Sequence, residues 1–258
     1  MLSSMRVVVF TSQKGGSGKT TLSGHVAVQA ELSGQGPVAL IDTDPQGSLA
    51  AWWNARSSPT PVFVQTDVAR LFHDLEELRR KGVRLVVIDT PPAVTATIRS
   101  VVGYADLVVI PTRPSPHDLR AVGATLDIVE GRGKPLVFVV NDATPRARIT
   151  SEAAIALSQH GTVAPVTVHH RTDFASSMID GRTVQEIAPA CRSAAEIREL
   201  WNYISLRLQK IQPRVVPIVT MVDRPVFGRH DAAQGVAPPA PAVTPGVPVF
   251  GRRAGMDQ

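Results

Sequence analysis

A glycine-rich segment with two lysines, Gln13-Lys-Gly-Gly-Ser-Gly-Lys-Thr-Thr21, carries the strongest chemical signal in the sequence. It lies between an apolar run and a helix-like run, and glycines allow successive backbone N–H groups to point toward one anion. Lys19 is placed to reach the β and γ phosphates of a nucleotide, and the Thr20 hydroxyl to bind Mg²⁺. The segment predicts a polyphosphate-binding loop of variant form, because Gln13 replaces its first glycine and Lys14 adds a second cation.

Carboxylates directly follow two other apolar runs. Residues 41–47 have the sequence IDTDPQG, and residues 86–92 have the sequence VVIDTPP. Ligands of doubly wound sheets bind at the carboxyl ends of the strands, so we expect Asp42, Asp44 and Asp89 to lie near the phosphates. For Asp42 and Asp44, helix capping and turn formation before the following proline are the alternative.

An alternation of strand-like and helix-like runs positions these segments and extends to residue 212. The expected strands are Arg6–Thr11, Pro37–Ile41, Val62–Gln65, Arg84–Asp89, Asp106–Pro111, Pro135–Asn141 and a last one near Ala164–Val168. The expected helices are Thr20–Ser33, Val68–Lys81, 95–102, 117–130, 147–159 and Arg192–Ile211. Strands that are apolar on both faces indicate a mostly parallel sheet with helices on both sides. Residues 1–212 are therefore predicted to form one doubly wound α/β domain.

Residues 213–258 have a different composition, since they hold eight of the 21 prolines of the chain. Such a segment cannot form a helix or a central strand, and we expect a flexible, proline-rich, disordered tail. It repeats the sequence PVFGR at 225–229 and 248–252. This repeat is either a short docking motif or a product of chance.

Composition excludes several classes of protein. No apolar run approaches the roughly 20 residues of a membrane-spanning helix, and the start lacks the pattern of an export signal. The single cysteine, Cys191, excludes an intramolecular disulfide and a thiolate metal cage. We therefore expect a cytoplasmic protein. The net charge of +5 is spread along the chain and is a weak argument for nucleic-acid binding by itself.

The three motifs together resemble those of a known family. KGGSGKTT resembles the deviant Walker A motif of the ParA/MinD family of P-loop ATPases, which position plasmids, chromosomes and other cargo. IDTDPQG resembles the DxDPQ element of that family, and VVIDTPP resembles its Walker B strand. The resemblance covers residues 5–211 and favours the ParA-like branch. It implies a P-loop NTPase fold and hydrolysis of the β–γ phosphoanhydride bond of ATP.

The resemblance also implies roles for single residues. Lys14 would cross an ATP-dependent homodimer to the phosphates of the partner, and Asp44 would position the attacking water. Asp89 would hold Mg²⁺ with Asp42 nearby, and Asn141 would bind the adenine unless it caps the next turn. The expected ATP-binding residues are Lys14, Gly15, Gly16, Ser17, Gly18, Lys19, Thr20, Thr21 and Asn141. The expected catalytic residues are Lys14, Lys19 and Asp44, and the expected Mg²⁺ ligands are Thr20, Asp89 and Asp42.

Partners follow from the same resemblance. ParA-type members bind non-specific DNA as ATP dimers, and the candidate contacts are Arg146, Arg148, Arg171 and Arg192, unless these are ordinary solvated arginines. A ParB-like or cargo-adaptor protein would stimulate the ATPase, and the protein would associate with the nucleoid. Membrane docking of the MinD type is disfavoured, because prolines interrupt the C-terminal segment.

Two other classes share this type of loop. The iron protein of nitrogenase uses two cysteines per subunit to hold its cluster, and a chain with one cysteine is incompatible with that role. Amidoligases of the dethiobiotin or cobyrinate type use ATP to activate a carboxylate. They remain the alternative function, although Lys14 and the IDTDPQG segment favour the positioning ATPases.

Overall fold

The computed structural model describes residues 5–92 and 96–212, and the predicted tail with its PVFGR repeat lies outside them. Its strands are β1 (Arg6–Phe10), β2 (Val38–Asp42), β3 (Val62–Val64), β4 (Leu85–Asp89), β5 (Leu107–Thr112) and β6 (Leu136–Val140). The helices up to β6 are α1 (Lys19–Leu32), α2 (Ser48–Asn54), α3 (Leu71–Arg80), α4 (Ala96–Tyr104) and α5 (Pro116–Glu130). After β6 come α6 (Arg148–Ser158), α7 (Thr172–Ser177), η1 (Met178–Asp180), α8 (Val184–Ile187) and α9 (Arg192–Lys210).

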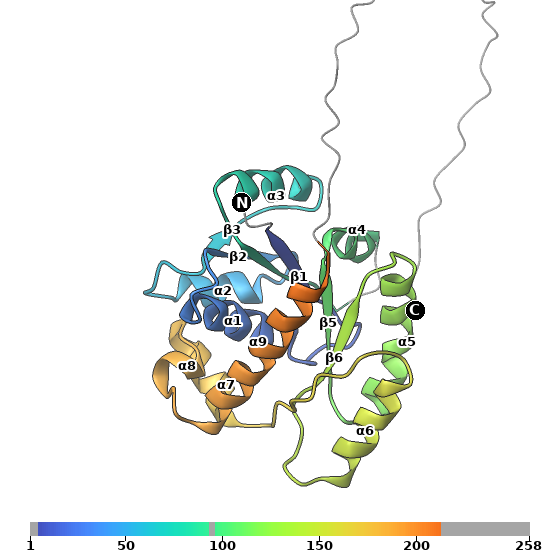
Figure 1. The fold of residues 1–258 in the computed structure, drawn as a ribbon. Helices are drawn as coiled ribbons and strands as arrows, with labels where there is room; N and C mark the ends of the chain where they lie inside the picture. Colours follow the sequence, from blue (N-terminus) through green and yellow to red (C-terminus); the bar gives the residue numbers. More distant parts are fainter. Residues whose placement is uncertain (1–4, 93–95, 213–258) are drawn as a thin grey trace, which may run out of the picture. The chain divides into compact units, whose positions relative to one another are not determined.

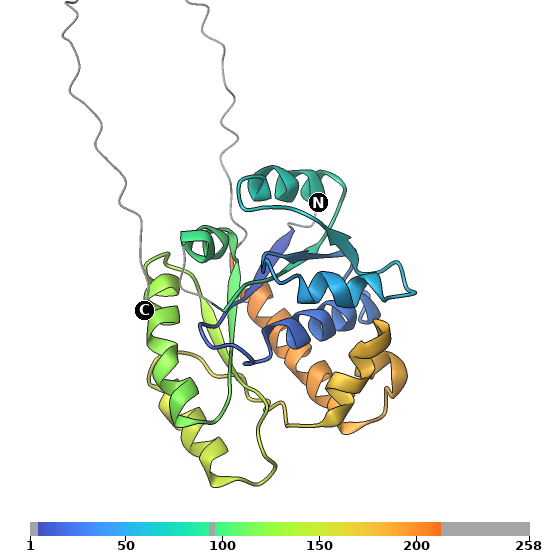
Figure 2. The same cartoon turned by 180° about the vertical axis from the view of Figure 1, so that it is seen from behind.

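Six strands form one sheet in the order β3-β2-β4-β1-β5-β6. In Figure 1, β3 and β6 lie toward opposite sides of this sheet. Every pair is parallel, and the register places Val8 of β1 opposite Val87 of β4. The central strand β4 is buried along its whole length. The helices connect parallel strands and cover both faces, which Figures 1 and 2 show from opposite sides. The predicted doubly wound α/β fold is confirmed.

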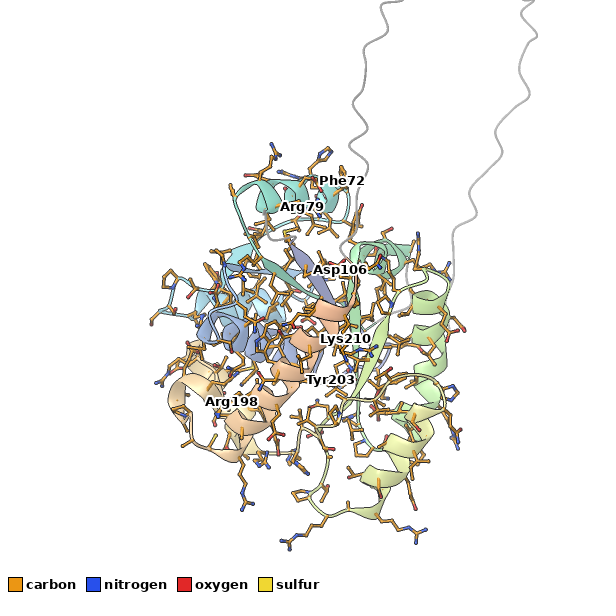
Figure 3. All side chains as sticks on the ribbon, viewed as in Figure 1. Phe72, Arg79, Asp106, Arg198, Tyr203 and Lys210 are labelled. Carbon is orange, nitrogen blue, oxygen red and sulfur yellow. The ribbon has the colours of Figure 1, made fainter. Side chains whose placement is uncertain are left out.

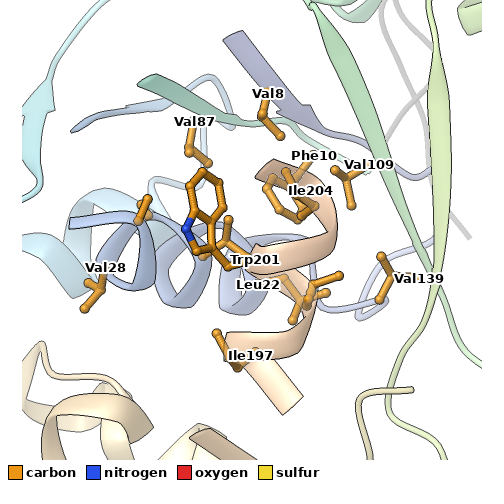
Figure 4. Packing of buried hydrophobic residues seen from close by; sticks show 14 of the residues in the cluster. Val8, Phe10, Leu22, Val28, Val87, Val109, Val139, Ile197, Trp201 and Ile204 are labelled. Atoms are coloured by element: carbon orange, nitrogen blue, oxygen red, sulfur yellow. The ribbon is translucent and has the colours of Figure 1, made fainter. Parts of the chain in front are cut away.

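Alternate residues of each strand supply two separate hydrophobic cores, because successive side chains point to opposite faces of a sheet. On one face, α1 and α9 pack on residues such as Val8 and Val87, and Figure 4 shows Trp201 of α9 at the centre of this cluster. On the other face, α3, α4 and α5 pack on the intervening residues, for example Val9 and Ile88. Both faces of the sheet are thus dry.

Polar side chains join the amino-terminal ends of two strands. Asp106, labelled in Figure 3 just before β5, accepts a hydrogen bond of 2.8 Å from the backbone N–H of Val7. Its other oxygen lies 3.8 Å from the guanidinium of Arg6. The carboxyl ends of the parallel strands all lie at the opposite end of the sheet. The loops after β1, β2 and β4 meet there.

The predicted last strand at 164–168 is wrong. This segment follows β6 only through isolated bridges, which pair Phe138 with Val163 and Ala143 with His169. Ala164 donates its backbone N–H to the carbonyl of Phe138 at 2.8 Å, and Val168 donates to that of Val140 at 3.0 Å. Four residues of this segment therefore span only two residues of β6, so no regular ladder forms. The short helices α7 and α8 that follow were also not predicted. Among the described residues, none of the helices combines the length and apolar character needed to span a membrane.

Candidate functional site

The glycine-rich loop runs from the carboxyl end of β1 to the amino terminus of α1. Gly16 and Gly18 have φ angles of 72° and 94°, a region that side chains rarely adopt. A Cβ atom on Gly18 would lie 2.1 Å from the side-chain nitrogen of Asn141. The backbone carbonyl of Gly18 accepts the first helical hydrogen bond, from Leu22, so the loop leads directly into α1. This is the predicted strand, loop and helix, with N–H groups and a helix amino terminus available to an anion.

Lys19 is the first residue of α1 and is almost fully buried, with 6% of its surface exposed. Its ammonium donates to the backbone carbonyl of Lys14 at 3.3 Å, so its charge is held over the loop. Burial lowers the pKa of Lys19, and the charges of Asp89 and Asp44 act in the opposite direction. Lys14, in contrast, is exposed at the rim of the loop. The two lysines therefore differ in environment as well as in position.

Thr20 and Asp89 meet where α1 begins and β4 ends. The hydroxyl of Thr20 donates to a carboxylate oxygen of Asp89 at 2.5 Å. Asp89 is 1% exposed, and burial raises its pKa to about 7, although the hydrogen bond from Thr20 acts to lower it. The nearby charge of Asp42 contributes to this increase. A hydroxyl and a carboxylate at the mouth of a phosphate loop are the oxygen donors that Mg²⁺ prefers, so these residues fit that ion.

Asp42, the last residue of β2, accepts hydrogen bonds from three backbone N–H groups. One carboxylate oxygen accepts from Asp44 at 2.9 Å, and the other accepts from Leu49 at 3.0 Å and Ala50 at 3.1 Å. Leu49 and Ala50 are in the first turn of α2. Asp42 therefore caps this helix, which is the alternative role given for it above. Its role toward the metal stays a prediction.

Asp44 is half-buried in the turn between β2 and α2. One of its carboxylate oxygens accepts the backbone N–H of Gln46 at 3.0 Å, and its backbone carbonyl accepts the N–H of Gly47 at 2.9 Å. The turn alternative is therefore present in the structure. It does not occupy both carboxylate oxygens, and the charge of Asp44 is close enough to raise the pKa of Lys19. The structure thus places Asp44 beside the phosphate loop.

Asn141 follows β6 and is 7% exposed. Its side-chain nitrogen donates to the backbone carbonyl of Ser17 at 2.8 Å, so the amide contacts the phosphate loop. Its contact with adenine stays a prediction.

A cavity of about 360 Å³ opens beside the loop, between Lys14 and the segments that follow β5 and β6. Arg113 lines it and forms an ion pair of 3.1 Å with Asp118, whose side chain is 3% exposed. Ser115 caps α5 by accepting the backbone N–H of Asp118 at 3.1 Å. Neither Arg113 nor Asp118 was predicted from the sequence. The spacing of Ser115 and Asp118, typical of a helix start, was the available signal.

The four arginines proposed for DNA contact differ in their environments. Arg171 donates to both carboxylate oxygens of Glu196, at 2.6 and 2.7 Å, and this pairing disfavours a direct contact with DNA phosphates. Arg148 is exposed and pairs with Glu152 one helical turn later. Arg146 and Arg192 are exposed. The structure therefore leaves three of the four on the surface.

Comparisons with known proteins agree with this geometry. Residues 8–184 match the model of the CobQ/CobB/MinD/ParA nucleotide binding domain. The chain is 31% identical over 202 residues to Maintenance of carboxysome distribution protein A of Halothiobacillus neapolitanus, which covers 74% of this chain and 92% of that protein. It is 32% identical over 128 residues to Protein ParA of Rhizobium radiobacter, which covers 48% of this chain and 56% of that protein.

Solved structures share the fold. The ATP complex of Cyanothece McdA aligns with a TM-score of 0.66 at 18% identity, covering 83% of this chain and 99% of that one. MinD of Aquifex aeolicus aligns with a TM-score of 0.64 at 16% identity, covering 78% and 96%. Because the matched domain includes the phosphate loop and spans most of the described residues, the chain belongs to the ParA/MinD family of P-loop ATPases with a deviant Walker A loop, on its ParA-like branch.

Proposed function

We propose that this chain binds ATP and Mg²⁺ at the glycine-rich loop, dimerises on ATP and hydrolyses it to position an intracellular cargo on DNA. One observation carries the proposal: Lys19, Thr20 and Asp89 converge at the carboxyl ends of β1 and β4. A buried cation, a hydroxyl and a buried carboxylate at one phosphate-binding loop match the requirements of nucleotide hydrolysis. The family membership supports the same reading.

Each residue of the site has a distinct task in this proposal. The loop N–H groups and Lys19 bind the phosphates, while Thr20 and Asp89 would hold Mg²⁺ with Asp42 behind them. When bound, the ion would neutralise the charge of the phosphate oxygens. Asp44 would orient the attacking water, since its carboxylate lies beside the loop and has an oxygen outside the Gln46 turn.

Lys14 supports the proposed ATP-dependent dimer. Its side chain is exposed and lines the cavity beside the loop, so it can reach a second subunit that closes over this face. An ammonium placed there would act on the phosphates of the partner as an arginine finger does.

DNA binding is proposed for the dimer through Arg146, Arg148 and Arg192, whose side chains are on the surface. The double variant R146A/R192A removes four arginines from the dimer, so it should lower the affinity for DNA of any sequence. The slope of log affinity against log salt should fall by about 3.6, roughly 0.9 for each lost phosphate contact. Arg79→Ala on α3 is the control, because it removes a surface arginine from another element. Unchanged DNA binding by the double variant would exclude both arginines.

The names of relatives support a choice of cargo. Two of them are called Maintenance of carboxysome distribution protein A. We therefore propose a protein compartment as the cargo, reached through an adaptor protein that stimulates the ATPase. The protein would then be cytoplasmic and associated with the nucleoid.

Two substitutions test the proposed reaction. Asp44→Ala should stop hydrolysis and leave the ATP dimer bound to DNA, whereas Lys19→Ala should abolish ATP binding. Glu130→Ala is a control, because this exposed carboxylate ends α5 at the opposite edge of the sheet. ATP turnover and DNA co-sedimentation are measured for all three. A normal rate of hydrolysis by the Asp44→Ala protein would refute the role of Asp44.

The amidoligase alternative is retained because the matched domain includes CobQ and CobB as well as MinD and ParA. It predicts a different dependence of ATP hydrolysis on added molecules. Slow hydrolysis that any DNA accelerates supports positioning. Hydrolysis that requires a small carboxylic acid would support ligation instead. Measuring ATP turnover with each addition separates the two.

A further inference from the structure

We infer that Asn141 is a positioning residue of the phosphate loop, which fixes the peptide between Ser17 and Gly18 so that one N–H group faces the bound phosphates. The inference rests on the proposed binding of ATP at this loop. It assigns to Asn141 a task that does not depend on the base of the nucleotide.

The position of Asn141 is well anchored. Its backbone N–H donates to the carbonyl of Thr112 at 3.0 Å, so the residue continues the pairing of β6 with β5. The side chain is buried and donates to the carbonyl of Ser17 at 2.8 Å, across 124 positions of sequence. A buried hydrogen bond from a rigid strand end holds the loop more firmly than solvent would.

Peptide geometry gives this contact its consequence. In a trans peptide the C=O and N–H groups point in opposite directions within one plane. The carbonyl of Ser17 points toward Asn141, so the N–H of Gly18 points the other way. A phosphate-binding loop requires N–H groups on its inner side, and rotation of this peptide would present a carbonyl oxygen to the phosphates instead.

Gly18 fits the same interpretation. Its φ of 94° and the 2.1 Å approach that a Cβ would make to the Asn141 nitrogen show that the amide packs directly on the loop backbone. One of the two N–H groups of the Asn141 amide is therefore bonded to the loop, whatever the remaining N–H and the oxygen contact. A role in reading adenine and a role in fixing the peptide make opposite predictions for ligands without adenine.

The test compares three ligands in the presence of Mg²⁺: ATP, GTP and inorganic tripolyphosphate. Asn141→Leu keeps the approximate size and the neutrality of the side chain but removes the N–H donor to the Ser17 carbonyl. Asn141→Ala removes the group altogether. Isothermal titration calorimetry should show all three ligands weakened by the same factor, about tenfold, the value of one hydrogen bond. Asn202→Ala, an exposed asparagine on α9, should leave all three affinities unchanged.

The outcomes are distinguishable. Loss confined to ATP, with GTP and tripolyphosphate unaffected, would overturn the inference and assign Asn141 to the adenine. Unchanged affinities together with a lower unfolding midpoint would also overturn it, because the residue would then be only structural. If the wild-type chain binds none of the three ligands, the proposed function fails, and the role of Asn141 fails with it.

Discussion

Acid should destabilise this protein through one buried histidine, His25 of α1. The residue is 0% exposed and lies two turns after the phosphate loop. Its Nδ1 is 2.8 Å from the carbonyl of Thr21, so Nδ1 carries the proton and donates. Its Nε2 accepts the backbone N–H of Val184 at 3.3 Å, and the ring stands edge-on to Phe174 at 5.3 Å. Both nitrogens are satisfied only when the imidazole is neutral.

The size of the effect follows from the pKa. Burial lowers the pKa of His25 from 6.5 to about 4 in the folded chain. The unfolded chain therefore binds a proton at a higher pH than the folded chain does, so this stability is present above pH 6.5 and is lost as the pH falls toward 4. Lowering the pH from 7 to 5 should remove about 2 kcal/mol, and full protonation on the order of 3 kcal/mol. A loss of 2 kcal/mol corresponds to roughly 4–8 °C in the unfolding midpoint.

The assay is urea unfolding of three proteins at several values of pH between 7 and 5. His25→Gln cannot gain a proton at this position, so its stability should fall less with acid than that of the wild type, by about 2 kcal/mol over this range. His73→Gln, which removes an exposed imidazole from α3, should follow the wild type. Equal pH dependence of all three proteins would refute the assignment of a neutral, buried His25.

Three further predictions concern other parts of the chain. Arg56→Ala should cost roughly 3 kcal/mol in urea unfolding, the lower end for a buried ion pair, because its partner Glu186 keeps 20% of its side chain exposed. Gly18→Ala should abolish ATP binding in calorimetry because of the forced φ and the overlap described above, whereas Gly123→Ala, with open space at its Cβ, should not. Deletion of residues 213–258 should leave basal ATPase unchanged and alter localisation by fluorescence microscopy; unchanged localisation would mean that the tail is only a linker.

The sequence predicted the parts of the site that local patterns encode. The loop glycines, Lys19 and Asp89 follow or precede apolar runs, and a parallel sheet brings such strand ends together whatever the side-chain details. Thr20 meets Asp89 for the same reason. The wrong strand at 164–168 has a cause that no local pattern encodes, because four residues of this segment span only two residues of β6.

The sequence did not predict the hydrogen-bond partners that two of the proposed site residues have in the fold. From the sequence alone, Arg171 is an ordinary surface cation. Only the fold shows that its guanidinium donates hydrogen bonds to Glu196, 25 positions later. Asn141 has the position of a base-reading residue, and only the fold brings Ser17 to its amide. A sequence shows the chemical type of each side chain. It does not show which residue elsewhere in the chain forms a hydrogen bond or ion pair with that side chain in the folded protein.

Residues 172–187 contact both the helix that follows the phosphate loop and the segment that follows α2. Gln185 of α8 donates to the carbonyl of His25 at 2.8 Å, and thereby contacts the helix that begins at the phosphate loop. The same segment receives Arg56, which follows α2 and donates to the carbonyl of Gly181 at 2.7 Å and to both oxygens of Glu186. The helices that begin after the phosphate loop and after the Asp44 turn therefore share one support, formed by residues more than 120 positions later. Any shift of this support must act on both loops, since neither helix can move away from it without breaking buried hydrogen bonds.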